Sequence, residues 1–200
     1  MTASRLAGLD GQTAERVIAT ARALALGRAG QAATELKPAL ESCPDHPEVL
    51  RLHAGVLNLQ GKFPAARAAM ERAIRLRPLD ALYHNTLGTI LGSAGDLDAS
   101  ILALRRACEL QPDLADAWYN LGLMLIRCVR GNEAGDALYR AVSLDPDNLD
   151  ARAMLADRLR VAGQVEQSAA EYREVLARQP CSGVAWWGLA ELRTGSLTRD

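Results

Sequence analysis

A proline recurs at a fixed interval along this chain of 200 residues. Prolines occupy positions 44, 78, 112, 146 and 180, so every gap is 34 residues. Small residues lie twelve and twenty-four places before each of these prolines, and a glycine lies seventeen places before four of the five. A strict period of this length indicates that one supersecondary unit is repeated along the chain.

Each repeated unit is predicted to contain two helices joined by a tight turn. Apolar residues recur at helical intervals on both sides of the glycine, and the high content of Ala and Leu favours helices. Glycine accommodates the positive φ that ends the first helix, and proline stops the second by denying it an amide donor. Because one hairpin cannot bury its apolar face alone, neighbouring hairpins should stack into a continuous solenoid.

The repeat is best preserved in the fourth unit, which carries a tryptophan, a leucine and a glycine in its first helix. Its pattern residues are Trp118, Leu121, Gly122, Ala134, Ala141 and Pro146. Their spacing resembles the W-x2-L-G, A, A and P pattern of the tetratricopeptide repeat (TPR) family. The resemblance covers residues 13–193, about five and a half units, and implies an all-α, right-handed superhelical solenoid of helix-turn-helix repeats.

The period divides the chain into units with defined limits. We expect an N-terminal tail over residues 1–12 and a single solenoid over residues 13–200. The expected segments are units 13–46, 47–80, 81–114, 115–148 and 149–182, a half unit 183–193 and a polar tail 194–200.

Two local departures from the pattern should affect the helices around them. Pro38 lies inside the second helix of the first unit, which it should kink. In the fourth unit Val129 replaces the turn glycine, and Gly131 and Gly135 follow it. Because glycine in a helix interior costs about 1 kcal/mol relative to alanine, we expect this turn to be the loosest part of the array.

Two adjacent tryptophans lie in the final half unit. Trp186 has the register of Trp118 and is expected to pack near Tyr172 and Val175 on the preceding helix. Trp187 should face either the inner groove or solvent. Because no second helix is expected after this one, the stack should end with exposed apolar surface, and self-association through this end is one hypothesis.

The same segment supports a narrower resemblance. Residues 186–194 follow the pattern W-W-x-L-A-x-L-[KR]-T, which resembles the junction before the catalytic domain in bacterial TPR-containing sulfotransferases. This resemblance implies an alternative function, the N-terminal region of a larger enzyme that recruits its substrate or partner. In that family the catalytic domain binds its sulfated nucleotide through a phosphate-binding loop, and no such loop occurs in these 200 residues.

Sequence signatures of catalysis or metal binding are missing. The chain has no P-loop, dinucleotide-binding or H-E-x-x-H motif, so we expect no enzyme activity, cofactor or metal in it. His53 and His84 on successive first helices could form a metal pair, but packed histidines are the interpretation we favour. The four cysteines, which lack C-x-x-C spacing, are expected to be reduced packing residues rather than disulfide partners or metal ligands. They are Cys43, Cys108, Cys128 and Cys181.

The charge balance argues against nucleic-acid and membrane partners, because the net charge is −1 and the two halves of the chain do not differ in their balance. All 23 basic residues except Lys37 and Lys62 are arginines, which would suit carboxylate or phosphate recognition but also follows from genomic base composition. The start lacks the apolar core of a signal peptide, and no apolar run approaches the roughly 18 residues that span a bilayer. We expect a bacterial, cytoplasmic protein.

The remaining candidate site is the inner surface of the solenoid, which the TPR resemblance places on the first helices. Asn, Tyr, Arg and Trp side chains facing it can hold an extended peptide, so we predict a non-catalytic module that binds a peptide or protein segment in the concave groove. Asp116 and Asp150 lie where chaperone-binding TPR proteins carry a lysine, which disfavours capture of a chaperone carboxylate. The candidate groove residues are Arg51, Asn58, Asn85, Asp116, Tyr119, Arg127, Asp157, Arg160 and Trp187.

Overall fold

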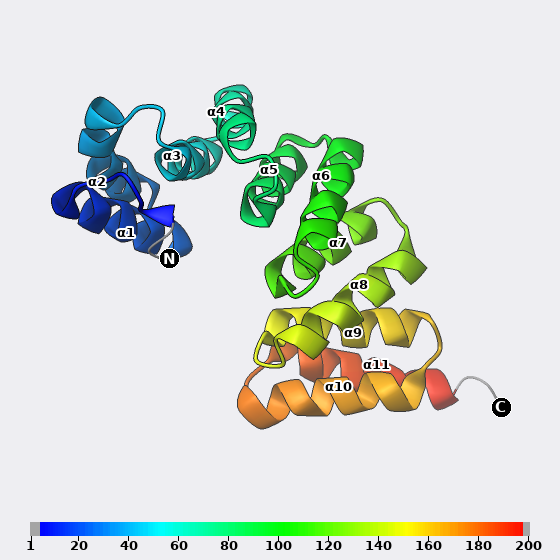
Figure 1. Ribbon diagram of the computed structural model, residues 1–200. Coiled ribbons are helices and arrows are strands. Elements are labelled where there is room, and N and C mark those ends of the chain that lie inside the picture. The colour runs from blue at the N-terminus through cyan, green and yellow to red at the C-terminus, as the bar shows by residue number, and fades with distance from the viewer. Residues whose placement is uncertain (1–4, 198–200) are drawn as a thin grey trace. The chain divides into compact units, whose positions relative to one another are not determined.

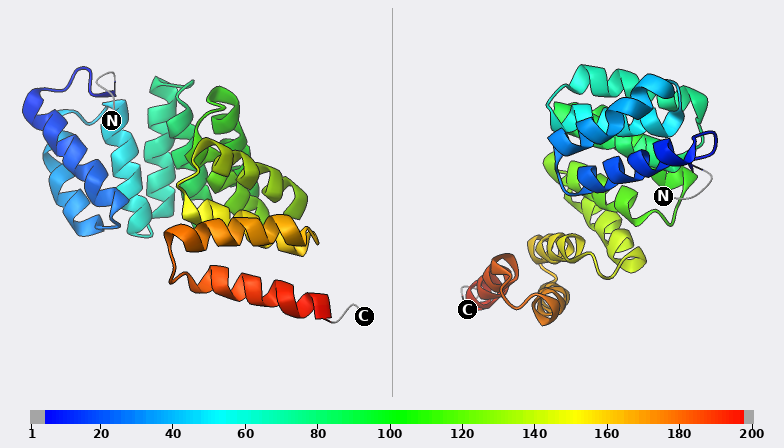
Figure 2. Two further views of the ribbon diagram at one scale, coloured as in Figure 1. Left: turned by 90° about the horizontal axis from the view of Figure 1, so that it is seen from below. Right: turned by 90° about the vertical axis from the view of Figure 1, so that its left-hand side faces the viewer.

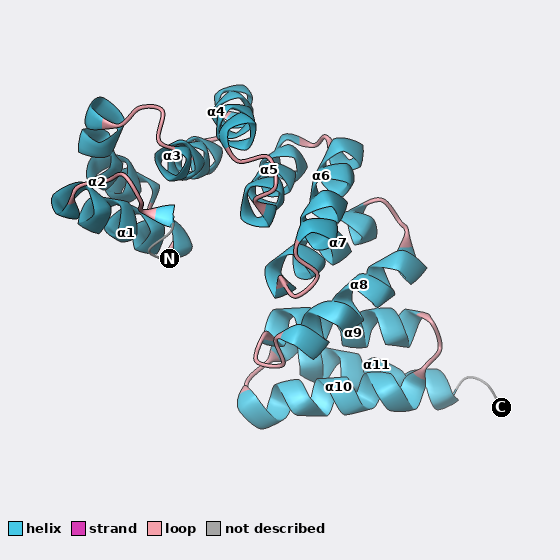
Figure 3. Ribbon diagram, viewed as in Figure 1, coloured by secondary structure: helices cyan, strands magenta, loops and turns pink. Residues whose placement is uncertain are grey.

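The computed structural model describes residues 5–197 and consists of α-helices joined by short loops (Figures 1 and 3). No strand occurs within these residues, as predicted. None of the described helices has the length and apolar character needed to cross a membrane. The chain divides into two compact units, residues 1–111 and 112–200.

The described part of the first unit contains three helical hairpins. Its helices are α1 (Gly11–Ala25), α2 (Ala29–Ser42), α3 (Pro47–Leu59), α4 (Phe63–Leu76), α5 (Ala81–Ala94) and α6 (Leu97–Leu110). Each helix packs against the next, and the first helices of successive hairpins, α1, α3 and α5, also pack against one another. The hairpins of this unit therefore stack in sequence order, as the period predicts.

The second unit continues the alternation with two hairpins and one further first helix. Its described helices are α7 (Ala115–Arg127), α8 (Gly131–Leu144), α9 (Leu149–Val161), α10 (Val165–Arg178) and α11 (Gly183–Leu197). Successive helices pack together, and α9 also contacts α11. Both views of Figure 2 show α10 and α11 lying side by side.

The turns within the hairpins have the left-handed backbone that the sequence predicts. Gly95, between α5 and α6, has φ 89°. The turn glycines of the first, second and fifth repeats also have positive φ angles. Val129 takes the same conformation, with φ 59°, between α7 and α8. This conformation is strained for a β-branched residue, so the fourth turn keeps its geometry at a local cost.

Small residues allow close approach between the two helices of a hairpin. A Cβ atom added to Gly88 would lie 2.5 Å from Cγ of Leu104, and one added to Gly122 would lie 2.8 Å from Cγ of Leu138. Both leucines are fully buried. The period of small residues therefore records helix contacts rather than backbone flexibility.

In four of the five loops that follow a repeat proline, the side chain six residues after the proline donates a hydrogen bond back to the loop. The ring or guanidinium of this residue bonds the carbonyl oxygen of the proline, so histidine, tryptophan and arginine have the same structural role at this position. The bonded pairs are His84 and Pro78 (2.8 Å), Trp118 and Pro112 (2.9 Å), Arg152 and Pro146 (3.3 Å), and Trp186 and Pro180 (2.9 Å).

Pro38 lies inside α2, which runs without interruption from Ala29 to Ser42. The Ser42 hydroxyl donates a hydrogen bond of 2.9 Å to the Pro38 carbonyl oxygen. Proline removes its own amide donor but leaves its carbonyl free to act as an acceptor. Pro38 thus remains within a single helix.

Trp186 does not fill the core that the sequence predicts for it. Its side chain is 59% exposed, and the core around Tyr172 and Val175 is completed by Ala185 and Leu189. Trp118, at the same repeat position, packs against a cluster to which its own second helix, α8, contributes. Within the described residues α11 has no second helix, so the corresponding face of Trp186 stays exposed.

Candidate functional site

The first unit brings three of the predicted groove residues into one pocket. Arg51 and Asn58 on α3 and Asn85 on α5 line a pocket of about 240 Å³. Leu24 extends the lining to α1, so all three first helices of the unit contribute. The other lining residues are Gly55, Leu59, Thr86, Thr89 and Ile90.

Three side-chain oxygens of this pocket are available as hydrogen-bond acceptors. Asn58 Oδ1 is buried and has no hydrogen-bond partner within the described chain. Thr86 and Thr89 donate their hydroxyl hydrogens to carbonyls one turn earlier in α5, at 2.8 and 3.1 Å, which leaves their oxygens as acceptors. An N–H donor from a bound peptide backbone would satisfy Asn58, because buried polar groups are rarely left unpaired.

Arg51 is occupied by a carboxylate that the sequence analysis missed. Glu48 is fully buried, and Arg51 donates to it from Nε at 3.1 Å to each oxygen and from Nη2 at 2.5 Å. The spacing of three residues on one helix was the available signal. The charge of Arg51 is therefore matched within the protein, and the pocket is close to neutral.

Glu48 also belongs to a network that reaches the N-terminal segment. Arg5 lies 3.6 Å from Glu48 and donates a 2.8 Å hydrogen bond to Asp80, which caps α5 through the amide of Leu82. The Arg5 guanidinium also lies 5.6 Å from the centre of the Tyr83 ring. Burial, followed by the charges of Glu48 and Asp80, raises the pKa of Tyr83 to about 12. Its hydroxyl therefore stays protonated near neutral pH.

In the second unit, Glu191 on α11 contacts two predicted residues, and a third joins them through Arg160. Arg160 lies 3.0 Å from Glu191 and donates to Asp157 at 2.6 Å, while Trp187 Nε1 donates to Glu191 at 3.0 Å. Burial alone would raise the pKa of Asp157, but hydrogen bonds from Arg158 and Arg160 outweigh it and lower that pKa. Trp187 is 69% exposed, so this ion-pair cluster carries an indole at the surface.

The other three predicted residues lie along α7. Asp116 and Arg127 are exposed near its two ends, and the Arg127 guanidinium contacts the Met124 sulfur at 3.7 Å. Tyr119 is partly buried against a cluster from α8 and α9, and burial together with the charge of Asp150 raises the pKa of its hydroxyl. These residues form a polar row along one helix.

The cysteines differ in their surroundings. Cys108 is buried, and desolvation raises the pKa of its thiol to about 12, so little thiolate exists at neutral pH. Cys181 is exposed, and the packing role predicted for the cysteines does not extend to it. Across the described residues no group of three or more His, Cys, Asp or Glu side chains is arranged to hold a metal ion.

Stacked helical hairpins with polar first-helix faces define a helical repeat protein. A family model described as a tetratricopeptide repeat matches residues 22–81 and 153–198, more than half of the chain, and two further TPR models match residues 88–126 and 115–148. The chain therefore belongs to the tetratricopeptide repeat family, and the predicted all-α solenoid class is confirmed. Proteins of this family are generally scaffolds for protein interactions.

Solved structures of other TPR proteins share the fold. TTC0263, a thermophilic TPR protein of Thermus thermophilus, is 20% identical, with a TM-score of 0.74 over 91% of this chain and 99% of that chain. YrrB, described as a TPR protein with an unusual peptide-binding site, is 18% identical, with a TM-score of 0.61 over 86% and 88%. At these identities the likeness concerns the fold alone.

Two curated relatives are much longer than the region they share with this chain. Cellulose synthase 1 operon protein C of Komagataeibacter xylinus is 29% identical over 162 residues, which cover 74% of this chain and 12% of that protein. Anaphase-promoting complex subunit 3 of Schizosaccharomyces pombe is 27% identical over 109 residues, which cover 54% and 16%. The chain thus spans less than a fifth of the length of either relative.

Proposed function

We propose that this chain is a non-catalytic interaction module that binds an extended peptide segment of a partner protein in the pocket of its first unit. The observation that carries the proposal is the buried, unpaired Oδ1 of Asn58 in a pocket of about 240 Å³ built by three first helices. A backbone N–H of a peptide is the donor that fits it. No catalytic residue is assigned to the chain.

The electrostatics of the pocket favour an uncharged ligand segment. Glu48 matches the charge of Arg51, and the lining is completed by acceptor oxygens and by the apolar side chains Leu24, Leu59 and Ile90. Such a lining suits a peptide backbone with a small apolar side chain better than a carboxylate or phosphate. We assign the polar row of α7 and the cluster on α9 and α11 as further contact surfaces of the second unit.

Asn58→Leu tests the proposal with little change of side-chain size. Peptides would be selected from a random displayed library against the wild-type chain, and their affinities measured by calorimetry. We expect Asn58→Leu to weaken binding by roughly tenfold, the value of one lost hydrogen bond, without lowering the melting temperature. Gln31→Ala, which removes an exposed amide from α2, serves as the control. A library that enriches no peptide, or peptides that bind Asn58→Leu as tightly as wild type, would contradict it.

The sequence alone suggests Arg51→Ala as a variant that weakens binding and leaves stability unchanged. The structure makes it unsuitable for this purpose. Removing Arg51 takes the closest partner away from Glu48, whose side chain is 0% exposed. We expect a loss of about 3 kcal/mol in the free energy of unfolding, measured by urea denaturation. Replacing both residues by methionine should restore most of it, because the buried carboxylate of Glu48 is then gone and Arg5 keeps Asp80 as its partner. Full stability of Arg51→Ala would contradict this role.

A second candidate function is the substrate- or partner-recruiting region of a bacterial sulfotransferase. It rests on the amino-acid sequence of residues 186–194 and on the exposure of Trp186. Trp118, at the same position of the fourth repeat, is partly buried. Reading the gene beyond codon 200 decides between the two functions. An immediate stop codon would remove this alternative.

The end of the second unit also supports self-association as a proposal. Val184, Trp186 and Trp187 on α11 are 63%, 59% and 69% exposed, a concentration of large apolar side chains on one helix. If copies dock through this end, Trp187→Lys should lower the mass measured by light scattering. An unchanged mass would count against docking there.

The cellular setting belongs to the same proposal. We place the module in the bacterial cytoplasm with a protein partner, and without nucleic-acid or membrane partners. The supporting observation is the net charge of −1, which gives no field to attract a polyanion. Fractionation of cells that produce the tagged chain tests this location, and recovery with membranes would contradict it.

A further inference from the structure

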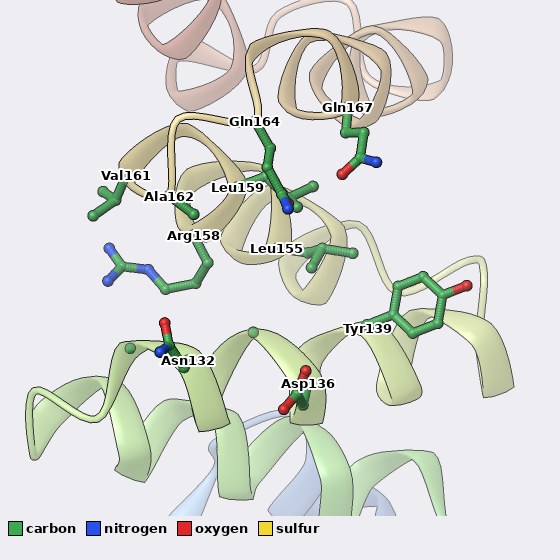
Figure 4. Close-up of a pocket in the computed structure, with 12 residues that line it drawn as sticks. Asn132, Asp136, Tyr139, Leu155, Arg158, Leu159, Val161, Ala162, Gln164 and Gln167 are labelled. Carbon is green, nitrogen blue, oxygen red and sulfur yellow. The ribbon is translucent and has the colours of Figure 1, made fainter.

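A second pocket, of about 460 Å³, lies in the second unit and contains none of the predicted groove residues. It is lined by α8, α9, α10 and the turn between the last two helices (Figure 4). Leu155 and Leu159 of α9 contribute apolar surface to it, and Gly131 and Gly135 belong to α8. The pocket is therefore amphipathic, with a gap in side chains along α8.

Two glycines create this gap. Gly131 and Gly135 lie one repeat period after Leu97 and Ile101 of the third unit, and among the five repeats only the fourth has glycine at both positions. Ile101 is 2% exposed, so the third unit buries a side chain of its own at this position. Compared with the third unit, the fourth therefore lacks two bulky side chains at this place.

Neither glycine is required by the backbone. Neither is among the residues with positive φ, and a Cβ atom added to Gly131 or Gly135 would meet no atom within 4 Å. Gly88 and Gly122, in contrast, have no room for a Cβ atom. Glycine also lowers the stability of a helix. What the two glycines provide is therefore the open space beside α8.

The polar rim of the pocket is balanced in charge. Arg158 of α9 and Asp136 of α8 are both among its lining residues (Figure 4). Arg158 also pairs with Asp157, and its Nε is buried without a hydrogen-bond partner in the described residues. The amides of Asn132, Gln164 and Gln167 supply both donors and acceptors. This rim matches the alternating N–H and C=O groups of a peptide backbone better than it matches a charged ligand.

We propose that this pocket docks a partner polypeptide, which inserts one bulky aliphatic or aromatic side chain into the space left by Gly131 and Gly135. The inserted side chain contacts Leu155 and Leu159, and the rim amides bond the adjacent backbone. Tyr139, which is 67% exposed at the edge of the pocket, provides additional contact area. The site is independent of the groove pocket in the first unit.

Refilling the gap tests the proposal without weakening the fold. Gly135→Leu places a side chain in open space and should leave the chain at least as stable, so a loss of binding cannot be attributed to unfolding. Gly30→Leu is the matched control, because Gly30 also lies in a helix and a Cβ atom added there would likewise meet no atom within 4 Å. Asn58→Leu, which alters only the groove pocket, should behave as wild type here.

The probes are N-acetyl-phenylalaninamide and N-acetyl-leucinamide, titrated into the labelled chain and followed by amide NMR shifts. We expect saturable shifts around residues 132–139 and 155–164, with a dissociation constant of roughly 1 mM for fragments of this size. N-acetyl-alaninamide should bind at least fivefold more weakly, and Gly135→Leu should abolish the shifts. Absence of saturable shifts in wild type, or equal binding by Gly135→Leu, would overturn the site.

A peptide probe separates a polypeptide ligand from a small molecule. A blocked Gly-Gly-Phe-Gly-Gly peptide should bind at least threefold more tightly than the single blocked phenylalanine, because its backbone reaches the rim amides. Equal affinity would overturn the assignment to a polypeptide, since the pocket would then recognise the side chain alone.

Discussion

The third and fourth hairpins have the same plan but differ at the residues that form the turn. Between α5 and α6 the left-handed position is Gly95, and Asp96 caps α6 by accepting from the amide of Ala99 at 3.3 Å. Between α7 and α8 the same positions hold Val129, with φ 59°, and Arg130, which makes no side-chain cap. The fourth hairpin forms without the local signals that favour the third.

The contact that both hairpins retain lies between their helices. In each, a glycine of the first helix meets a fully buried leucine of the second, Gly88 with Leu104 and Gly122 with Leu138. The comparison teaches that helix packing dominates the turn, because the fourth turn adopts a strained backbone to preserve the same contact. The residues of the turn adjust the stability of a hairpin, whereas the packing between its two helices determines whether it forms.

Adding a methyl group where the two helices of a hairpin touch should reduce stability the most. Gly88→Ala should lower the free energy of unfolding by about 2–3 kcal/mol, and Gly122→Ala by about 1–2 kcal/mol. The ranking follows from the 2.5 and 2.8 Å separations between the added Cβ and the leucine Cγ, and from a backbone oxygen at 3.2 Å in the third hairpin against 3.6 Å in the fourth. Urea denaturation measures both. A larger loss at Gly122 would show that leucine repacking, not the separation, controls the cost.

The turn residue should have the next largest effect. Val129→Gly relieves the left-handed strain and should raise the free energy of unfolding by about 1–2 kcal/mol. Gly95→Val, the reverse exchange in the third hairpin, should lower it by at least as much. Val129→Ala is the control, because alanine gains little at a positive φ. Thermal unfolding of the wild type and the three variants measures these changes. If Val129→Gly is no more stable than the wild type, backbone strain does not distinguish the two turns.

The caps should have the smallest effect. Asp96→Ala removes the side-chain bond to the amide of Ala99 and should cost about 1 kcal/mol. Arg130→Ser introduces a cap but loses the exposed pair with Glu133, so we expect a net gain of only about 0.5 kcal/mol. Differential scanning calorimetry resolves shifts of this size. A loss of stability in Arg130→Ser would mean that the ion pair contributes more than a cap.

Much of the architecture could be predicted from the chain's own periodicity. The spacing of the prolines predicts helical hairpins that stack in order, and the structure confirms this within each of its two units. The single solenoid over residues 13–200 and the groove as a binding site stay predictions. Of the predicted groove residues, Arg51, Asn58 and Asn85 share one pocket, and Glu191 contacts Arg160 and Trp187, with Asp157 joined to them through Arg160.

The helices, their turns and their order of stacking follow from the sequence alone, because they depend on backbone preferences and apolar spacing that repeat along the chain. Only the tertiary structure showed that Arg5 bonds Asp80, 75 residues away, that Arg51 is occupied by Glu48, and that two glycines open a pocket in α8. Such pairings and spaces depend on which side chains packing brings within a few ångströms. A local pattern contains no record of those distances.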